Sequence, residues 1–332
     1  MKSHTYDFKG SDLGTLLGWP LVLPVLLAAV MHLGAAWRLL PAPRPILDID
    51  RTILIHQAEA SRLRHGADVV FLGDSSCLMD FSAKDLEGWL PPDHRVLNLA
   101  TLSYVDLPAC AGLLRNYVAA NPDRLRVVVL LLHPEMLRGI EPVPQYLAWL
   151  QKFYDGADAC DPNTVSGRLS CLLGFDILKG RLLSRVLPVP LAKSYGRYYG
   201  FTTDLHRFLT AQQGSAIDPH QFVPQPGQGN TEYRLSAKME TAGSAFRSAL
   251  PPGAQLIVGI TPSPQSFVTA DYPVRHLTML ADWSQCLQAD GVLADLPPTL
   301  PDRFFASTTH LNEAGAQLYA KILARSLRQH LR

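Results

Sequence analysis

The sequence predicts an α/β protein in which helices cover both faces of a mostly parallel sheet, preceded by one N-terminal transmembrane helix. Two observations predict the globular part. Strand-like and helical segments alternate along the chain, and residues 126–132 (RVVVLLL) form a continuous apolar run typical of a strand buried on both faces. A third observation predicts the membrane helix, because the 25 positions from Leu13 to Trp37 contain no Asp, Glu, Lys or Arg.

The composition excludes several classes of protein. Apolar residues make up 47% of the 332 positions and charged residues 18%, which suits a buried core and argues against disorder. A net charge of +1 provides no basic excess for a nucleic-acid partner. The spacing of His and Cys matches no metal site, and no organic cofactor is implied. Among the 5 cysteines, Cys160 and Cys171 either pair or remain free thiols like the others.

The uncharged N-terminal segment is long enough to cross a bilayer. As a helix it would extend ~37 Å, and a bilayer core of about 30 Å needs roughly 20 apolar residues. Trp19 and Trp37 bracket the segment as interfacial tryptophans do. We therefore expect a tail at 1–12 and an uncleaved anchor at 13–37. The alternatives are a cleaved signal peptide, whose cleavage site Leu33-Gly34-Ala35 matches poorly, and a buried core helix, which rarely lacks a polar face.

Regular elements follow a linker at 38–65 that ends in a helix near 52–65. In order, we expect strands at 67–72, 95–99, 126–132, 255–260 and 291–296, and helices at 82–90, 107–120, 233–250, 274–289 and 312–331. Residues 141–230, rich in Tyr, Pro, Gly and Gln, are interpreted as an insertion in a domain that extends over 66–332. Ligands bind parallel sheets of this kind at the carboxyl ends of the strands.

The segment Phe71–Ser76 (FLGDSS) directly follows the first apolar strand. A serine at that point is exposed to the cleft, Gly73 permits a sharp turn, and the following helix offers backbone N–H groups to an oxyanion. We therefore expect Ser75 to be a nucleophile and assign Asp74 to the oxyanion or binding region. An ordinary polar turn between a strand and a helix is the alternative interpretation.

The segment Thr309–Ala316 (THLNEAGA) immediately precedes the last helix, for which Asn312 is the expected N-cap. A histidine in the loop after the last strand can reach over the carboxyl edge of the sheet to a serine that follows the first strand. An unperturbed imidazole has a pKa near 6.5, which suits removal of a hydroxyl proton. We therefore expect His310 to be the general base for Ser75, with a histidine that merely packs near a helix start as the alternative.

Together these two motifs resemble those of a known family. The GDS triplet at 73–75 and the H-L-N-x-x-G-A pattern at 310–316 are similar to blocks I and V of the SGNH (GDSL) hydrolases, over roughly residues 66–332. The resemblance implies a three-layer, flavodoxin-like sheet in which Ser75 forms an acyl-enzyme and His310 transfers the proton. A membrane helix before such a domain is similar to polysaccharide O-acetyltransferases of the alginate O-acetyltransferase and D-alanyl-transfer protein type.

Two stretches near the motifs differ from the family pattern. The family's Asp, three residues before the histidine, is replaced by Ser307. Asp302, the nearest upstream acid, is therefore expected to orient His310, with Ser307 or a backbone carbonyl as alternatives. Ser103 stands where the family has its oxyanion glycine, in a stretch that begins at Asn98, and we assign both residues to the oxyanion or binding region.

A third difference concerns the end of the third strand. His133-Pro134-Glu135 replaces the family's G-x-N-D block, so no asparagine side chain is available there to hold an oxyanion. We assign Glu135 to the binding region, and a polar strand end that faces solvent is the alternative. A degenerate site of low activity is a further consequence that these differences allow.

The resemblance implies a membrane-anchored serine O-acyltransferase or acyl esterase that acts on a glycan of the envelope or an exopolysaccharide, or on another acylated substrate. It places the domain on the periplasmic side of the cell membrane and implies an acyl-donating integral membrane protein as a partner. One alternative is a catalytically degenerate SGNH-like scaffold that binds glycan or organises a polysaccharide modification or export complex. Another is a cytoplasmic lipase or thioesterase tethered to the membrane.

Overall fold

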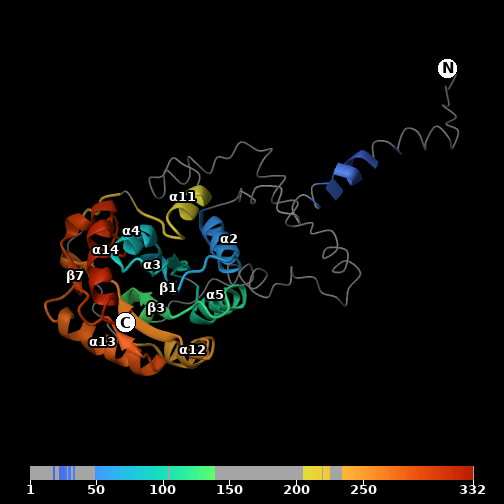
Figure 1. The fold of residues 1–332 in the computed structure, drawn as a ribbon. Coiled ribbons are helices and arrows are strands. Elements are labelled where there is room, and N and C mark those ends of the chain that lie inside the picture. Colours follow the sequence, from blue (N-terminus) through green and yellow to red (C-terminus); the bar gives the residue numbers. More distant parts are fainter. Residues whose placement is uncertain are drawn as a thin grey trace, which may run out of the picture. The chain divides into compact units, whose positions relative to one another are not determined.

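The computed structural model describes residues 49–103, 105–138, 205–218, 220–224 and 234–331, together with Gly18 and positions 22–27, 29–30 and 33. By its internal contacts the chain divides into two units, Met1–Ile46 with Asp158–Val189 and Leu47–Ala157 with Pro190–Arg332. The second unit contains both the sheet and the candidate site (Figure 1).

The central sheet consists of five parallel strands in the order β2-β1-β3-β4-β6. The strands are β1 Val69–Gly73, β2 Val96–Asn98, β3 Val127–Leu132, β4 Gln255–Ile260 and β6 Gly291–Val292. The chain winds outward from β1 in both directions, as it does in flavodoxin-like doubly wound proteins. The predicted α/β class and mostly parallel sheet are therefore confirmed.

Helices cover both faces of the sheet because successive strand residues point to opposite sides. Phe71 and Val129 pack with one set of helices, whereas Leu72 and Leu130 pack with the other. The first set is α3 Ser75–Met79, α4 Ala83–Trp89, α11 Leu205–Ala211 and α14 Glu313–Leu327, and the second set is α5 Leu107–Ala120, α12 Ala237–Arg247 and α13 Tyr272–Leu287 (Figure 1).

The remaining described elements are short or lie at the edge of the sheet. Helix α2, Ile49–Ser61, contacts both α5 and α11. Near the carboxyl end of the sheet are α6 Pro134–Leu137, a two-stranded parallel ladder of β5 Ser263–Pro264 with β7 Thr299–Leu300, and the 3-10 turns η1 Gln265–Phe267 and η2 Asp302–Phe304. The short helices α3, α6 and α11 were not expected, because one or two turns give too little periodicity to be recognised.

The range 141–230 was expected to be an insertion, but its described end is part of the domain. Leu205 and Leu209 of α11 lie in the core on the α4–α14 face. The backbone N–H of Asn98 donates to Gln213, and that of Ala216 donates to Leu78. Residues 205–218 therefore pack directly beside β2 and α3, which gives this segment access to the candidate site.

Among the described residues, no helix has the length and apolar character needed to cross a membrane. The expected anchor at 13–37 is therefore unsupported. Only Gly18 and positions 22–27, 29–30 and 33 of that range are described, and all are helical. The rest of the range, the tail at 1–12, Cys160 and Cys171 lie outside the described residues. The cysteines in the described part of the chain are free thiols, at Cys77, Cys110 and Cys286.

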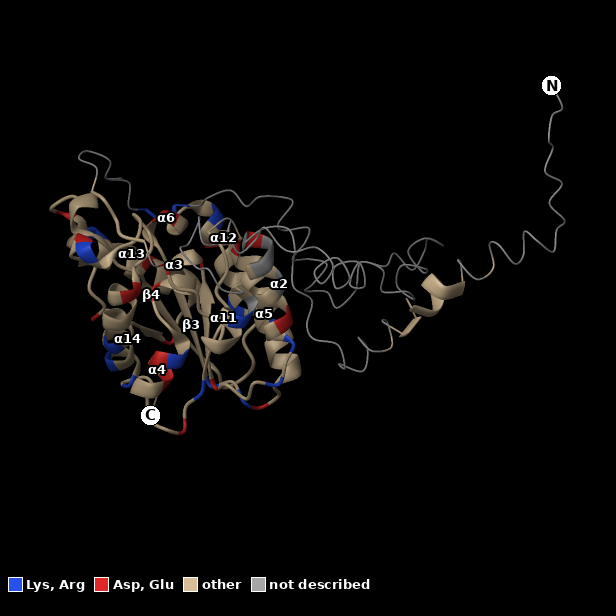
Figure 2. Ribbon diagram, turned by 90° about the horizontal axis from the view of Figure 1, so that it is seen from above, with Lys and Arg blue, Asp and Glu red and all other residues tan. Residues whose placement is uncertain are grey.

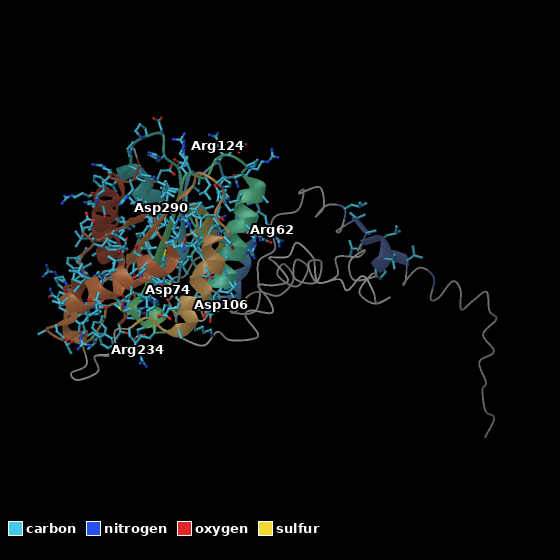
Figure 3. All side chains as sticks on the ribbon, turned by 90° about the horizontal axis from the view of Figure 1, so that it is seen from below. Arg62, Asp74, Asp106, Arg124, Arg234 and Asp290 are labelled. Atoms are coloured by element: carbon cyan, nitrogen blue, oxygen red, sulfur yellow. The ribbon has the colours of Figure 1, made fainter. Side chains whose placement is uncertain are left out.

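Charged side chains help to identify the two ends of the sheet. Asp74 follows β1, whereas Arg124 precedes β3 and Asp290 precedes β6. Figure 3 accordingly shows Asp74 at one end of the domain, and Arg124 and Asp290 toward the other. Basic and acidic side chains are interspersed over the described helices (Figure 2). The carboxyl end of the sheet, marked by Asp74, is the end where ligands bind in this class of fold.

Candidate active site

Ser75 is the first residue of α3, directly after the turn that ends β1. The turn requires glycine at position 73, because a Cβ atom there would lie 1.9 Å from the carbonyl oxygen of Leu131 on β3. Strand β1 thus approaches β3 closely where the chain leaves the sheet. Ser75 is largely buried, with 7% of the residue exposed.

Asp74 fixes this turn rather than facing a ligand. Its Oδ1 caps α3 by accepting from the backbone N–H groups of Ser76 at 3.0 Å and Cys77 at 3.3 Å. Its Oδ2 accepts from the backbone N–H of His133 at 2.8 Å, which ties the end of β3 to the same carboxyl group. Burial raises the pKa of Asp74, although these three hydrogen bonds oppose the shift. Asp74 therefore locks the turn, while Ser75 is left to face the site.

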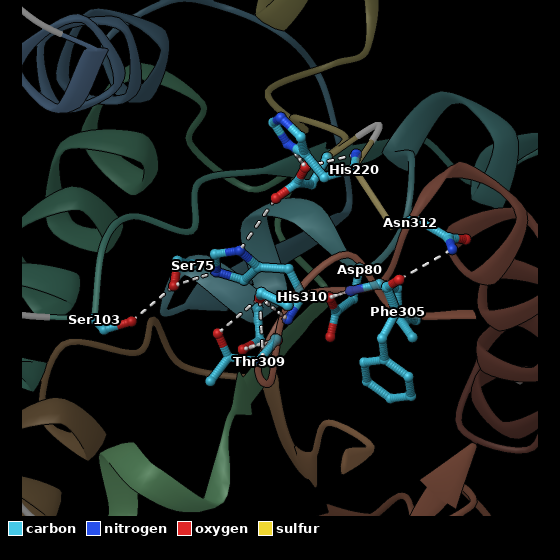
Figure 4. A network of polar contacts seen from close by, with 12 residues as sticks. Ser75, Asp80, Ser103, His220, Phe305, Thr309, His310 and Asn312 are labelled. Atoms are coloured by element: carbon cyan, nitrogen blue, oxygen red, sulfur yellow. Dashed lines mark hydrogen bonds and ion pairs between the residues drawn. The ribbon is translucent and has the colours of Figure 1, made fainter. Parts of the chain in front are cut away.

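The structure brings Ser75 and His310 together, as the two motifs predicted. His310 Nε2 lies 3.0 Å from Ser75 Oγ (Figure 4). A second hydroxyl, that of Ser103, lies 2.7 Å from Ser75 Oγ. When Ser75 donates its proton to an unprotonated Nε2, Ser103 is left to donate to Ser75. The serine hydroxyl is thus aligned toward a base, which is the arrangement that nucleophilic catalysis requires.

The loop that carries His310 is held by hydrogen bonds to its backbone. Ser307 Oγ accepts from the His310 N–H at 3.0 Å, and Asp80 Oδ1 accepts from the Leu311 N–H at 2.8 Å. Ser76 Oγ, beside the candidate nucleophile, donates to the Thr309 carbonyl at 2.9 Å. Ser307, considered as a group that orients the imidazole, therefore holds the histidine backbone instead.

The last helix begins where this loop ends. Asn312 caps α14 through Oδ1, which accepts from the Gly315 N–H at 3.0 Å, so the predicted N-cap is confirmed. Its Nδ2 donates to the carbonyl groups of Arg303 and Phe305. At Gly315 a Cβ atom would lie 2.1 Å from the carbonyl oxygen of Phe304. The asparagine and glycine of the motif thus join the loop to the helix, while the histidine faces the site.

The carboxylate beside His310 belongs to Asp218. Asp218 Oδ2 lies 3.7 Å from His310 Nδ1, and only 5% of Asp218 is exposed. Burial acts to raise the pKa of Asp218, but the nearby His310 imidazole and the hydrogen bonds from His220 outweigh it, so the pKa is lowered. The separation exceeds a direct hydrogen bond, and such contacts commonly tighten only when substrate is bound. Ser75, His310 and Asp218 therefore form a serine–histidine–acid arrangement (Figure 4).

Asp302 does not occupy the position expected of it. It begins η2, and its Oδ1 accepts from the backbone N–H of Ser266 at 3.0 Å. Within the described residues, Asp302 forms no ion pair with His310. The physical reason is that residues 305–311 close into a short turn, through the Phe305–Leu311 bridge and the hydrogen bond from the Ala306 N–H to the His310 carbonyl, while the Asp302 carboxylate before this turn is bound to the Ser266 N–H. The assignment of Asp302 as the orienting acid is thus replaced by Asp218.

Asn98 lies near the site, but its side-chain amide is already hydrogen-bonded within the protein. Its Nδ2 donates to the Cys77 carbonyl at 2.8 Å and to Ser215 Oγ at 3.0 Å, and its Oδ1 accepts from the Ala100 N–H. Asn98 is fully buried. It therefore joins β2 to α3 and to the segment that carries Asp218, and does not face a ligand. Of the two residues assigned from this stretch, Ser103 alone reaches Ser75.

His133 and Glu135 line a separate cavity of about 10 Å³, large enough for roughly one water molecule. Burial, reinforced by the charges of His310 and Arg138, lowers the pKa of His133 to about 3, so this imidazole is neutral. Its Nδ1 accepts from the Glu135 N–H, which leaves a proton on Nε2, 3.4 Å from Ser263 Oγ. Glu135 pairs with Arg138 at 3.2 Å. Glu135 thus borders the carboxyl edge of the sheet without contacting Ser75 or His310.

Sequence reasoning missed Asp218 because it lies at the end of the range interpreted as an insertion. Several other acids occur in that range, and no local pattern distinguishes the correct one. A histidine two residues after an aspartate occurs at Asp218 and His220 but also at Asp204 and His206, so this spacing does not identify Asp218. In the part of the chain that the structure describes, no group of His, Cys, Asp and Glu could hold a metal ion.

No family model matches this chain, and a search of curated proteins finds no significant match. Its function is therefore inferred from the residues and their geometry.

Proposed function

We propose that this protein is an SGNH-type serine O-acyltransferase or acyl esterase that acts through an acyl-enzyme on Ser75. One observation carries the proposal. At the carboxyl edge of a parallel sheet, His310 lies between Ser75 and Asp218, with Nε2 3.0 Å from Ser75 Oγ and Nδ1 3.7 Å from Asp218 Oδ2. The GDS and H-L-N-x-x-G-A motifs provide independent support, because both carry their characteristic residues into this site.

In the first half of the reaction, Ser75 Oγ attacks the carbonyl carbon of an acyl ester while its proton passes to His310 Nε2. Nδ1 then faces Asp218 as an imidazolium N–H, and the ionised carboxylate stabilises that positive charge. When the tetrahedral intermediate collapses, His310 returns the proton to the departing alcohol oxygen. The acyl group remains on Ser75 as an ester.

The second half uses the same groups in reverse. An acceptor hydroxyl, from water in an esterase or from a glycan in a transferase, loses its proton to His310 and attacks the acyl carbon. Ser75 leaves with the returned proton. The backbone N–H of Ser75, at the first position of α3, has no acceptor within its own helix and is a candidate donor to the oxyanion. Ser103, beside Ser75 Oγ, is the second candidate donor.

The substrate and location follow from the motif resemblance and from the uncharged segment at 13–37. They favour an acylated glycan of the envelope or an exopolysaccharide, a single-pass anchor and a periplasmic domain. An acyl-donating integral membrane protein would supply the acyl group.

Hydrolysis of p-nitrophenyl acetate by the full chain tests the chemistry directly. We expect measurable turnover that falls at least about 10³-fold in Ser75→Ala, because removal of the nucleophile leaves only the residual catalysis of the other groups. Ser244→Ala is the control, because this serine is exposed on α12 and its hydroxyl donates only to Thr241 of the same helix. A wild-type protein without turnover, or a Ser75→Ala variant with unchanged turnover, would favour the non-catalytic scaffold instead.

Fractionation tests the proposed location. We expect the full chain to sediment with membranes and to require detergent for release, whereas a chain that begins at residue 38 should remain in the supernatant. The reason is that burial of about 20 apolar residues in the bilayer holds a protein there essentially irreversibly. Full-length protein recovered without detergent would contradict the anchor but would leave the proposed chemistry intact.

A further inference from the structure

Asp218 contacts a second histidine through the carboxylate oxygen that does not face His310. His220 Nδ1 lies 2.7 Å from Asp218 Oδ1, and the His220 backbone N–H lies 3.0 Å from the same oxygen. Because an ionised carboxylate only accepts hydrogen bonds, the Nδ1 atom of His220 must carry a proton. One carboxylate oxygen is thus bound by two N–H groups of a single residue, and the other is left to face His310 (Figure 4).

We propose that His220 is a positioning residue that orients Asp218 toward His310, which extends the arrangement to Ser75–His310–Asp218–His220. The inference rests on the proposed function. The backbone of Asp218 forms a bridge with Asn312 but leaves the carboxyl group free to rotate about its side-chain bonds. Among the described residues, the groups that hold Oδ1 both belong to His220. Without the ring N–H, only the His220 backbone N–H holds Oδ1, so the orientation that presents Oδ2 to His310 is less restrained.

His220 differs from the other residues of the site in its exposure. The His220 side chain is 42% exposed, whereas that of Asp218 is 7% exposed. His220 also lines an open groove of about 420 Å³ with Gln221, Arg303 and Gln317. A direct contact between His220 and substrate is therefore the competing role, and kinetics distinguish the two. Positioning through Asp218 affects kcat, whereas a direct substrate contact affects KM.

Three substitutions separate the N–H donor from the shape of the side chain. In His220→Asn, the side-chain amide nitrogen occupies nearly the position of Nδ1 and still donates to Asp218. His220→Asp has the same size but lacks the donor and places a second carboxylate beside the first. His220→Ala removes the side-chain donor and retains the backbone donor.

The experiment measures kcat and KM for p-nitrophenyl acetate on the full chain, with wild-type protein and Ser75→Ala as references. We expect His220→Ala to lower kcat by about tenfold, as for loss of a hydrogen bond to a charged group. His220→Asp should be slower still, His220→Asn should remain within about threefold of wild type, and KM should stay constant. Melting temperatures of the three variants show whether each folds.

Three results would overturn the positioning role. The first is an Asn variant as slow as the Asp variant, and the second is all three variants at the wild-type rate. The third is a rise in KM with unchanged kcat, which would make His220 a substrate contact. Absence of turnover in the wild-type protein would instead refute the proposed function itself, so the two failures are distinguishable.

Discussion

The turn that carries Ser75 and the segment that carries Asp218 meet at one site but are held in different ways. The Ser75 turn is fixed by its neighbours in sequence, since Gly73 allows the close approach to β3 and Asp74 caps the helix that Ser75 begins. The Asp218 segment is fixed from a distance, through Leu78 of α3 and Asn312 of the α14 cap. The nucleophile is thus set by a local motif, and the acid by tertiary packing.

The two partners of the imidazole also differ in distance. Ser75 lies 3.0 Å from His310, whereas Asp218 lies 3.7 Å away on the other side of the ring. Substitutions in the acid segment, in the turn that carries Ser75 and at Asp80 beside the His310 loop should therefore have different effects.

The largest effect is expected in the acid segment, from Asp218→Asn. Loss of the carboxylate removes the partner of His310 Nδ1 and should lower kcat by roughly 10²–10⁴-fold, as it does in serine–histidine–aspartate enzymes. Asp302→Asn is the matched control, because the Asp302 carboxylate contacts the Ser266 N–H. This variant should lower kcat by less than about tenfold. Steady-state hydrolysis by both variants compares the two acids. Equal losses, or a larger loss in Asp302→Asn, would contradict the assignment.

The next effect concerns the stability of the nucleophile turn. In Gly73→Ala the new Cβ atom would meet the Leu131 carbonyl oxygen at 1.9 Å, so β1 and β3 must separate. We expect the free energy of unfolding to fall by about 3 kcal/mol or more. In Gly88→Ala, on the exposed side of α4, the added Cβ atom meets nothing within 4 Å, and stability should be unchanged or rise by up to about 1 kcal/mol. Urea unfolding of both variants provides the comparison, and a Gly73→Ala variant as stable as wild type would refute the argument.

The smallest effect concerns Asp80, which ends α3 and accepts from the Leu311 N–H beside His310. Burial raises the pKa of Asp80 well above its ordinary value; the Leu311 N–H opposes this shift, and the charges of Asp74 and Asp218 add to it. A carboxyl group whose pKa is raised by folding contributes stability that is fully present below its unfolded pKa of about 4. That contribution is lost as the pH rises through the folded pKa.

Asp80→Asn keeps the shape and a hydrogen-bond acceptor but cannot ionise. At pH 4 the free energy of unfolding of the variant should therefore match that of wild type within about 1 kcal/mol. Above pH 4, wild type should lose stability relative to the variant. Urea unfolding at pH 4, 6 and 8 measures this difference, with Asp93→Asn on an exposed loop as a control for the lost charge. A difference that does not change with pH would show that Asp80 is ionised in the folded protein throughout this range.

The sequence predicted those parts of the molecule that depend on neighbouring residues. The bounds of α5 and β4 matched their predicted ranges, because each has strong periodicity or a continuous apolar run. Ser75, His310 and the Asn312 cap followed from motifs of a few residues. Asp218, by contrast, reaches the site only because α11 packs into the core beside Asn98, a tertiary contact with no local signal.

The central claim is that Ser75 is a nucleophile activated by His310, and labelling with a fluorophosphonate followed by peptide mapping tests it most directly. We expect a single adduct on the peptide that contains Ser75, absent in Ser75→Ala and formed much more slowly in His310→Ala, because the serine then lacks its base. The Ser244→Ala variant, changed at an exposed serine of α12, should label at close to the wild-type rate. An adduct that persists in Ser75→Ala, or a His310→Ala variant that labels as fast as wild type, would contradict the account.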